Sequence, residues 1–189
     1  MKRAGHADLD AVSFGGSSAV ASPRMILMIA RGRHVFERLR SRFKQPEPAA
    51  PPETLRRFGP SDRPIAESGV SLDHDGWRIE AREAGSVPLF EVVEPTVEHC
   101  LLTYRADLRT SDLDRGAYLE MWCRLPGRGE FFSKGVDQTV SGTTSWSSRE
   151  VPFYLKAGQS PDLIRLNVAL EGAGTVWIRN VEVLRTPLR

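Results

Sequence analysis

The chain has 189 residues, with 26 lysines and arginines against 24 aspartates and glutamates and a formal net charge of +2. This total averages two unlike parts: residues 1–57 hold 11 basic and 5 acidic residues, for +6, whereas residues 58–189 hold 15 and 19, for −4. Domains that bind nucleic acid concentrate positive charge on their folded surface, so this distribution argues against a nucleic-acid partner. Because no run of about 18 apolar residues occurs, the sequence predicts no transmembrane helix.

Residues 1–57 are expected to form a basic N-terminal arm that is disordered or partly helical. Over residues 25–44, apolar residues recur at three-, four- and seven-residue spacings, and arginines crowd the other positions, which predicts an amphipathic helix. Such a helix can contact a membrane surface peripherally or bind an acidic partner. The alternatives are a short helix that docks on the domain and an arm with no specific role. Four prolines within residues 45–52 predict an extended linker.

The beginning of the sequence lacks the pattern of a secretory signal. The apolar stretch at residues 25–30 is short, lies deep in the chain and runs directly into arginines. The first residue is left open among Met1, Met25 and Met28, since none of them yields a signal. The compartment is therefore unknown, with the cytoplasm as the default expectation.

Residues 58–189 predict one all-β domain, an antiparallel jelly-roll β-sandwich. Short runs of β-forming residues alternate with turn residues, and no helical pattern separates them. About 130 residues are enough to build a sizeable core. The expected strands are 69–73, 77–84, 88–94, 99–109, 117–125, 130–134, 148–156, 163–170 and 174–184.

Two of these strands are expected to form a hairpin. Residues 99–109 and residues 117–125 both alternate between apolar and polar side chains, and the polar segment 110–116 is interpreted as their connection. Matching the apolar faces of the two strands places Arg105 opposite Glu120, a favourable pairing of opposite charges.

The polar face of this hairpin is the predicted binding surface. It gathers Tyr118, Trp122, Arg105, Glu120 and Arg124 into a patch of aromatic and charged groups. Such a patch suits sugars, whose C–H faces stack on aromatic rings while carboxylates and guanidinium groups meet the hydroxyls. The alternative is that Trp122 lies under a loop or the N-terminal segment and that the arginine–glutamate pair is a surface ion pair.

The two cysteines are expected to be buried free thiols. In the hairpin register, Cys100 and Cys123 share the apolar face as diagonal neighbours about 7–8 Å apart, which does not suit a disulfide. Free thiols fit a reducing compartment. No C-x-x-C pair and no histidine at ligand spacing accompany them, so no metal site is predicted.

The C-terminal half of the chain carries a composite motif. Ser-Gly-Thr-Thr-Ser-Trp at residues 141–146 is followed by β-type segments at 151–155 and 163–168 and by Gly-Ala-Gly-Thr-Val-Trp-Ile at 172–178. The chain resembles, over residues 68–187, the galactose-binding-domain-like superfamily, which includes many carbohydrate-binding modules. The resemblance implies a jelly-roll fold, but it says little about the identity of the ligand because these modules serve many functions.

One position departs from that family pattern. Members of the superfamily often have two aspartates after Trp-Ile and hold a structural calcium with a carboxylate from this strand, whereas this chain has Arg179 and Asn180. The resemblance therefore does not carry calcium over. Residues 73–75, Asp-His-Asp, offer a cluster of oxygen and nitrogen ligands, but because they precede Gly76 they are interpreted as a turn. Trp146 and Trp177 are interpreted as large side chains that pack in the core or at the rim of the sandwich, rather than as surfaces on which a ligand stacks.

No catalytic motif occurs in the sequence, so neither a catalytic residue nor a cofactor is predicted. The first hypothesis is a non-catalytic jelly-roll module that binds a carbohydrate or a similar polar ligand through the patch around Trp122. The second is a structural or protein-interaction module whose face is covered by a partner, a second copy or its own N-terminal segment. The oligomeric state is left open.

Overall fold

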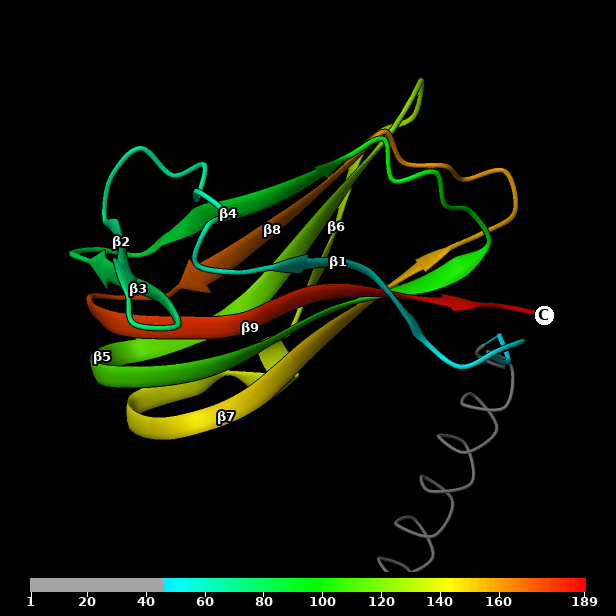
Figure 1. Cartoon of the computed structure of the whole chain (residues 1–189). Helices are drawn as coiled ribbons and strands as arrows, with labels where there is room; N and C mark the ends of the chain where they lie inside the picture. The colour runs from blue at the N-terminus through cyan, green and yellow to red at the C-terminus, as the bar shows by residue number, and fades with distance from the viewer. Residues whose placement is uncertain (1–45) are drawn as a thin grey trace, which may run out of the picture. The chain divides into compact units, whose positions relative to one another are not determined.

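The computed structural model describes residues 46–189, which contain nine antiparallel strands and one 3-10 turn (Figure 1). The elements are β1 (Glu53–Phe58), β2 (Val70–Asp73), β3 (Gly76–Ala81), β4 (Gly85–Val93), β5 (Cys100–Leu125), β6 (Gly129–Lys134), η1 (Val136–Gln138), β7 (Val140–Leu155), β8 (Leu163–Leu170) and β9 (Gly174–Pro187). The all-β, antiparallel architecture predicted from the strand pattern is confirmed.

The strands form two layers that share β5. In the β9 layer, β9 pairs with β1, β3 and the first half of β5, and β7 pairs with the same half of β5 from its other side. In the β8 layer, β8 pairs with β4 and the second half of β5, which also pairs with β6. Figure 1 shows β9, β5 and β7 side by side in the first of these layers.

The predicted hairpin at residues 99–125 is wrong, because Cys100–Leu125 form the single strand β5. Register shifts between Leu108 and Gly116 mark where the strand passes from one layer to the other, and Asp112 there has a φ of 53°. Bulges of this kind bend a strand and increase its twist. The polar residues 110–116 occupy this corner, and Leu113 within it stays buried. Residues 110–116 therefore have the composition of a loop but form a bend within a strand.

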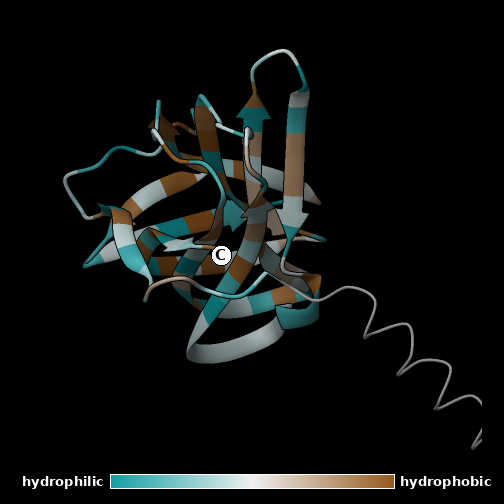
Figure 2. Cartoon of the chain, turned by 90° about the vertical axis from the view of Figure 1, so that its right-hand side faces the viewer, coloured by the Kyte–Doolittle hydropathy of each residue, from teal (hydrophilic) through white to brown (hydrophobic). Residues whose placement is uncertain are grey.

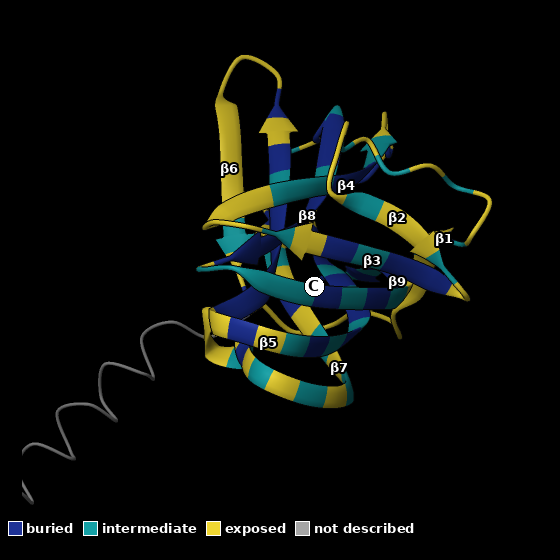
Figure 3. Ribbon diagram, turned by 90° about the vertical axis from the view of Figure 1, so that its left-hand side faces the viewer, coloured by how far each residue is buried: buried dark blue, intermediate teal, exposed yellow. Residues whose placement is uncertain are grey.

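The hydrophobic core lies between the two layers. Leu108 and Ile178 of the β9 layer and Met121 and Leu166 of the β8 layer belong to one buried cluster. Hydrophobic and hydrophilic residues alternate along the strands, as the period-2 geometry of a strand requires (Figure 2). Figure 3 shows the contrast between the buried strand β8 and the largely exposed strand β6.

Both cysteines are buried free thiols, as the sequence predicted. The register argument behind that prediction is wrong, since the two residues do not face each other across a hairpin. Cys100 lies opposite Leu155 of β7, and Cys123 lies opposite Ile164 of β8. The two halves of one strand therefore bring the thiols into the same core from different layers.

The sheet includes residues ahead of the domain boundary that the sequence predicts at residue 58. β1 starts at Glu53, and Pro48 forms an isolated bridge with Leu188 within the expected linker. The predicted helix at 25–44, with its membrane or acidic partner, lies outside the described residues and stays a prediction. Within residues 46–189, no helix has the length and apolar character needed to cross a bilayer.

Candidate functional site

Four of the five predicted site residues lie on the second half of β5. Alternation along the strand sends Ala117, Leu119, Met121 and Cys123 into the core. Tyr118, Glu120, Trp122 and Arg124 therefore lie on the outer face of the β8 layer. Their environments differ: Tyr118 and Glu120 are buried, Trp122 is half-buried and Arg124 is exposed.

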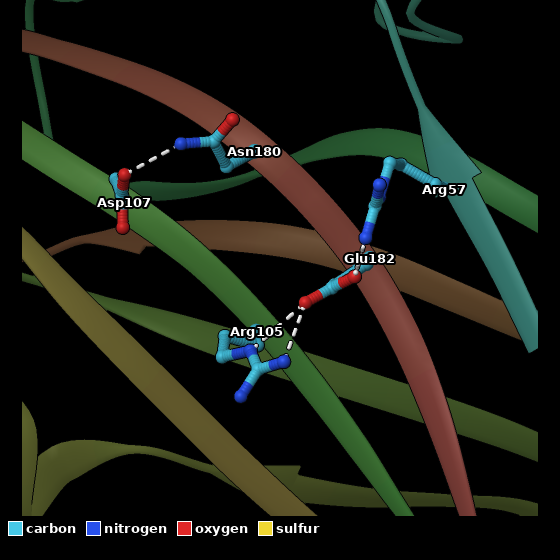
Figure 4. Close-up of polar contacts among 5 residues, drawn as sticks. All are labelled: Arg57, Arg105, Asp107, Asn180 and Glu182. Carbon is cyan, nitrogen blue, oxygen red and sulfur yellow. Dashed lines mark hydrogen bonds and ion pairs between the residues drawn. The ribbon is translucent and has the colours of Figure 1, made fainter. Parts of the chain in front are cut away.

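Arg105, the fifth predicted residue, lies in the other layer. Its neighbours across the sheet are Glu150 of β7 and Glu182 of β9 rather than Glu120, so the predicted pairing with Glu120 is wrong. Both Nε and Nη2 of Arg105 donate to Oε1 of Glu182, at 2.9 and 2.7 Å, while Arg57 donates to Oε2 at 3.0 Å (Figure 4). Burial opposes the charge on Glu182, but these two arginines outweigh it and lower the pKa of the carboxyl. Arg105 therefore belongs to an ion-pair cluster of the β9 layer that consists of Arg57, Arg105 and Glu182.

An open pocket of about 250 Å³, here called the Trp122 pocket, lies on the outer face of the β8 layer. Four neighbouring strands contribute to it, so its floor is the sheet itself. Its lining consists of Ser86 and Pro88 from β4, Arg165 and Asn167 from β8, Glu120 and Trp122 from β5, and Glu130 from β6.

Glu120 is the anchor of this pocket. Its Oε1 accepts hydrogen bonds from Trp122 Nε1 at 2.6 Å, Ser86 Oγ at 3.0 Å and Asn167 Nδ2 at 3.1 Å, and its Oε2 lies 3.2 Å from Lys134 Nζ. Burial is the largest single influence and favours the neutral acid. The four donors together outweigh it and hold the pKa of Glu120 below its ordinary value. The pocket therefore contains a fixed carboxylate.

Asn167 supplies an acceptor without a partner. The residue is 6% exposed, and its Nδ2 is used twice, donating to Ser86 and to Glu120. Its Oδ1 is buried and has no hydrogen-bond partner among the described residues. A buried acceptor left unpaired costs about 1–3 kcal/mol, so a ligand hydroxyl that donated to it would be favoured.

An aromatic wall borders the pocket. The rings of Trp122 and Phe132 have centroids 5.0 Å apart at an interplanar angle of 43°, and Phe132 is 55% exposed. The ammonium of Lys134 lies 5.1 Å from the Phe132 ring. The hydrogen bond to Glu120 fixes the edge of the Trp122 indole, so the ring is oriented before any ligand arrives.

Arg124 and Tyr118, two other predicted residues, do not line this pocket. Arg124 Nε donates to Asp162 at 2.8 Å, which ties β5 to the loop before β8. Tyr118 is 8% exposed and offers little surface. Of the five predicted site residues, only Glu120 and Trp122 therefore line this pocket.

Sequence reasoning missed the contributions of β4, β6 and β8 to this pocket. Asn167 and Arg165 interrupt the otherwise apolar run Leu163–Leu170, and polar residues inside a buried strand are a signal that something binds or pairs there. Arg165 pairs with Glu91 at 2.9 Å. The consecutive phenylalanines at 131 and 132 were a second signal, because one of two consecutive strand residues must face outward.

Among residues 46–189, no group of three or more histidine, cysteine, aspartate or glutamate side chains could hold a metal ion. Where the resembled family commonly has an acid, Arg179 lies 3.0 Å from Asp75 and 3.7 Å from Asp107, and Asn180 donates to Asp107 at 2.7 Å. A guanidinium therefore provides the positive charge between these carboxylates. Residues 74 and 75 form the turn between β2 and β3, as the sequence predicted.

Comparison with solved structures defines the fold. The xylan-binding domain CBM22-1 of Xyn10C from Paenibacillus barcinonensis matches with a TM-score of 0.51 at 10% identity, over 75% of this chain and 99% of that one. This similarity shows that the chain shares the jelly-roll fold of that domain. A family 16 carbohydrate-binding module matches with a TM-score of 0.45 at 10% identity, over 66% of this chain and 92% of the module. No family model and no curated protein matches the sequence.

Proposed function

We propose that this protein is a non-catalytic carbohydrate-binding module that holds a neutral sugar in the Trp122 pocket. The observation that carries the proposal is Asn167 in the lining of the pocket, whose Nδ2 donates to the carboxylate of Glu120 and whose Oδ1 has no partner among the described residues. Both groups accept hydrogen bonds, and sugar hydroxyls donate them. The jelly-roll fold supports the proposal at the level of architecture only.

The aromatic wall supports the same ligand class. A pyranose has an apolar C–H face and a polar rim, so it can stack on Trp122 and Phe132 while its hydroxyls reach the acceptors. An anionic ligand fits this pocket poorly, because the guanidinium of Arg165 is already paired with Glu91 and the ammonium of Lys134 with Glu120.

The state of Glu120 also argues for binding over catalysis. A glycosidase needs one carboxylic acid whose pKa is raised so that it can donate a proton near neutral pH. The pKa of Glu120 is lowered instead, and each of its oxygens already has a partner.

Calorimetric titration of the 189-residue chain with neutral xylo-, manno- and cello-oligosaccharides tests the proposal. We expect Trp122→Ala to weaken binding about tenfold or more and Asn167→Ala to weaken it as well. Trp146→Ala is the matched control, since it removes a half-buried indole from the β9 layer. Absence of binding by the wild type, or equal binding by Trp122→Ala, would contradict the proposal.

A specific observation also favours a second candidate, a protein-interaction module. Phe131 and Phe132 are 44% and 55% exposed on β6, which pairs only with β5 among the described strands. An exposed edge strand with apolar side chains can pair with another chain. Light scattering over a range of concentrations separates the two candidates. Self-association that Phe131→Ser abolishes favours the second candidate, whereas a monomer at all concentrations counts against self-association through β6.

A further inference from the structure

A second pocket, of about 340 Å³, lies on the outer face of the β9 layer. It is lined by Asp73, His74 and Asp75 from the β2–β3 hairpin, Arg109 from β5, Trp146 from β7 and Trp177 from β9. We propose that this Arg109 pocket binds an acidic sugar, a pyranose that carries a carboxylate. The site is separate from the Trp122 pocket, and its argument does not depend on a ligand being bound there.

Arginines and tryptophans alternate across this face. The guanidinium of Arg109 lies 4.3 Å from the ring centroid of Trp177 and 5.3 Å from that of Trp146. Arg179 lies 4.2 Å from the Trp146 ring, and Arg78 lies 5.8 Å from the Trp177 ring. Guanidinium groups therefore occupy positions over both indoles, where a sugar would otherwise stack. A ligand in this pocket must therefore contact the edges of the guanidinium groups and indoles rather than the faces of the indole rings.

Arg109 differs from the other two arginines of the stack. Arg78 is paired with Glu80 at 2.5 Å, and Arg179 is paired with Asp75 and Asp107. No hydrogen bond or ion pair within residues 46–189 involves the Arg109 side chain, and its Nε is buried without a partner. Packing between two indoles holds this guanidinium in place while leaving its donors unused. A planar fork of donors in a pocket suits a carboxylate.

The opposite wall of the pocket supplies acceptors. Asp73 accepts a hydrogen bond from Trp177 Nε1 at 2.7 Å and contacts His74, and hydrogen bonds to these two residues lower the pKa of its carboxyl. Asp75 uses one oxygen, Oδ2, for Arg179. Two carboxylates thus lie in the lining near a guanidinium that pairs with neither of them.

This combination discriminates between ligand classes. A neutral sugar would leave Arg109 unpaired, and a compact anion such as sulfate would meet repulsion from Asp73 and Asp75 without offering them a donor. A sugar acid satisfies both walls, because its carboxylate pairs with Arg109 while its hydroxyls donate to the aspartates.

The test is titration of the 189-residue chain with oligogalacturonides and oligoglucuronides, in parallel with their neutral counterparts. We expect the acidic oligomers to bind, and we expect Arg109→Gln and Arg109→Lys each to weaken that binding roughly tenfold or more. The lysine variant keeps the positive charge but lacks the planar fork. Trp122→Ala is the control, and it should leave the affinity for acidic oligomers unchanged.

A ligand-side comparison keeps the test decisive even if both Arg109 variants fail to fold. Methyl esterification of the oligogalacturonide removes the charge and keeps the sugar, so the wild-type chain should bind the ester far more weakly. Equal affinity for acid and ester, undiminished binding by either folded Arg109 variant, or no binding of any uronide would overturn the proposal. Loss of uronide binding in Trp122→Ala would assign the ligand to the other pocket and would overturn it as well.

Discussion

The indole Nε1 of Trp122 donates a 2.6 Å hydrogen bond to Oε1 of Glu120, two residues earlier on the same face of β5. Residues i and i+2 of a strand share a face, so a contact of this kind needs no contribution from the rest of the fold. It positions the aromatic ring and the carboxylate of the Trp122 pocket as one unit. The loss of either side chain therefore disturbs the other.

The buried carboxylate of Glu120 makes stability depend on pH. Its pKa in the folded protein lies below the ordinary value of 4.5, so the stability it contributes is present above that value and is lost as the pH falls through the folded pKa. Glu120→Gln should lower the free energy of unfolding by about 1–3 kcal/mol at pH 7. The difference from the wild type should shrink below pH 4.5 in urea titrations. Glu130→Gln, an exposed acid on the neighbouring strand, is the control and should change little.

The Arg57–Glu182–Arg105 cluster should respond unequally to loss of its two arginines. Arg105 makes two hydrogen bonds to Glu182, whereas Arg57 makes one and is 71% exposed. We expect Arg105→Ala to destabilise the fold by about 1 kcal/mol, a modest cost because this arginine is itself partly solvated. Arg57→Ala should cost less. Chemical denaturation measures both, and the additional change Glu182→Ala should restore part of the Arg105→Ala loss; equal costs for the two arginines would contradict this account.

Gly76 is required where β3 approaches β9. A Cβ atom at this position would lie 2.2 Å from the carbonyl oxygen of Ile178, so the strands would have to separate. Gly76→Ala should therefore lower the free energy of unfolding by about 1–3 kcal/mol or more. Gly85→Ala is the matched control, because nothing lies within 4 Å of a Cβ there. Similar melting temperatures for the two variants would rule out this steric explanation.

The two thiols should be inert in the folded protein. Burial raises the pKa of both, that of Cys123 to about 12, and the reactive species is the thiolate. A chromogenic disulfide reagent at pH 8 should detect no thiol in the native chain and both in denaturant. Rapid reaction of one cysteine without denaturant would show that the core opens locally at that position.

Strand composition was sufficient to predict most of this fold. The alternation at residues 117–125 predicted which side chains face outward, and the buried residues Leu166, Val168, Val176 and Ile178 follow the predicted pattern. The error at residues 110–116 has a physical cause. A strand that bends between layers needs polar residues and bulges at its corner, and its local sequence is then indistinguishable from that of a loop.

The composition of the pockets was predictable only in part. Glu120 and Trp122 are neighbours on one strand, so their contact follows from period-2 geometry. Asn167 reaches Glu120 through the pairing of β8 with β5, and Arg109 reaches Trp177 through the pairing of β9 with β5. Contacts between strands distant in sequence depend on which strands pair, and the alternation of apolar residues constrains the register only after the partner strands are known.

The continuity of β5 also constrains how this protein can come apart. One backbone supplies hydrogen bonds to β7 and β9 in one layer and to β6 and β8 in the other. Neither layer can separate from the other unless the hydrogen bonds between β5 and its neighbouring strands in one layer break. The two layers should consequently exchange their most protected amide hydrogens as one cooperative unit, at the rate of global unfolding rather than of separate layer openings.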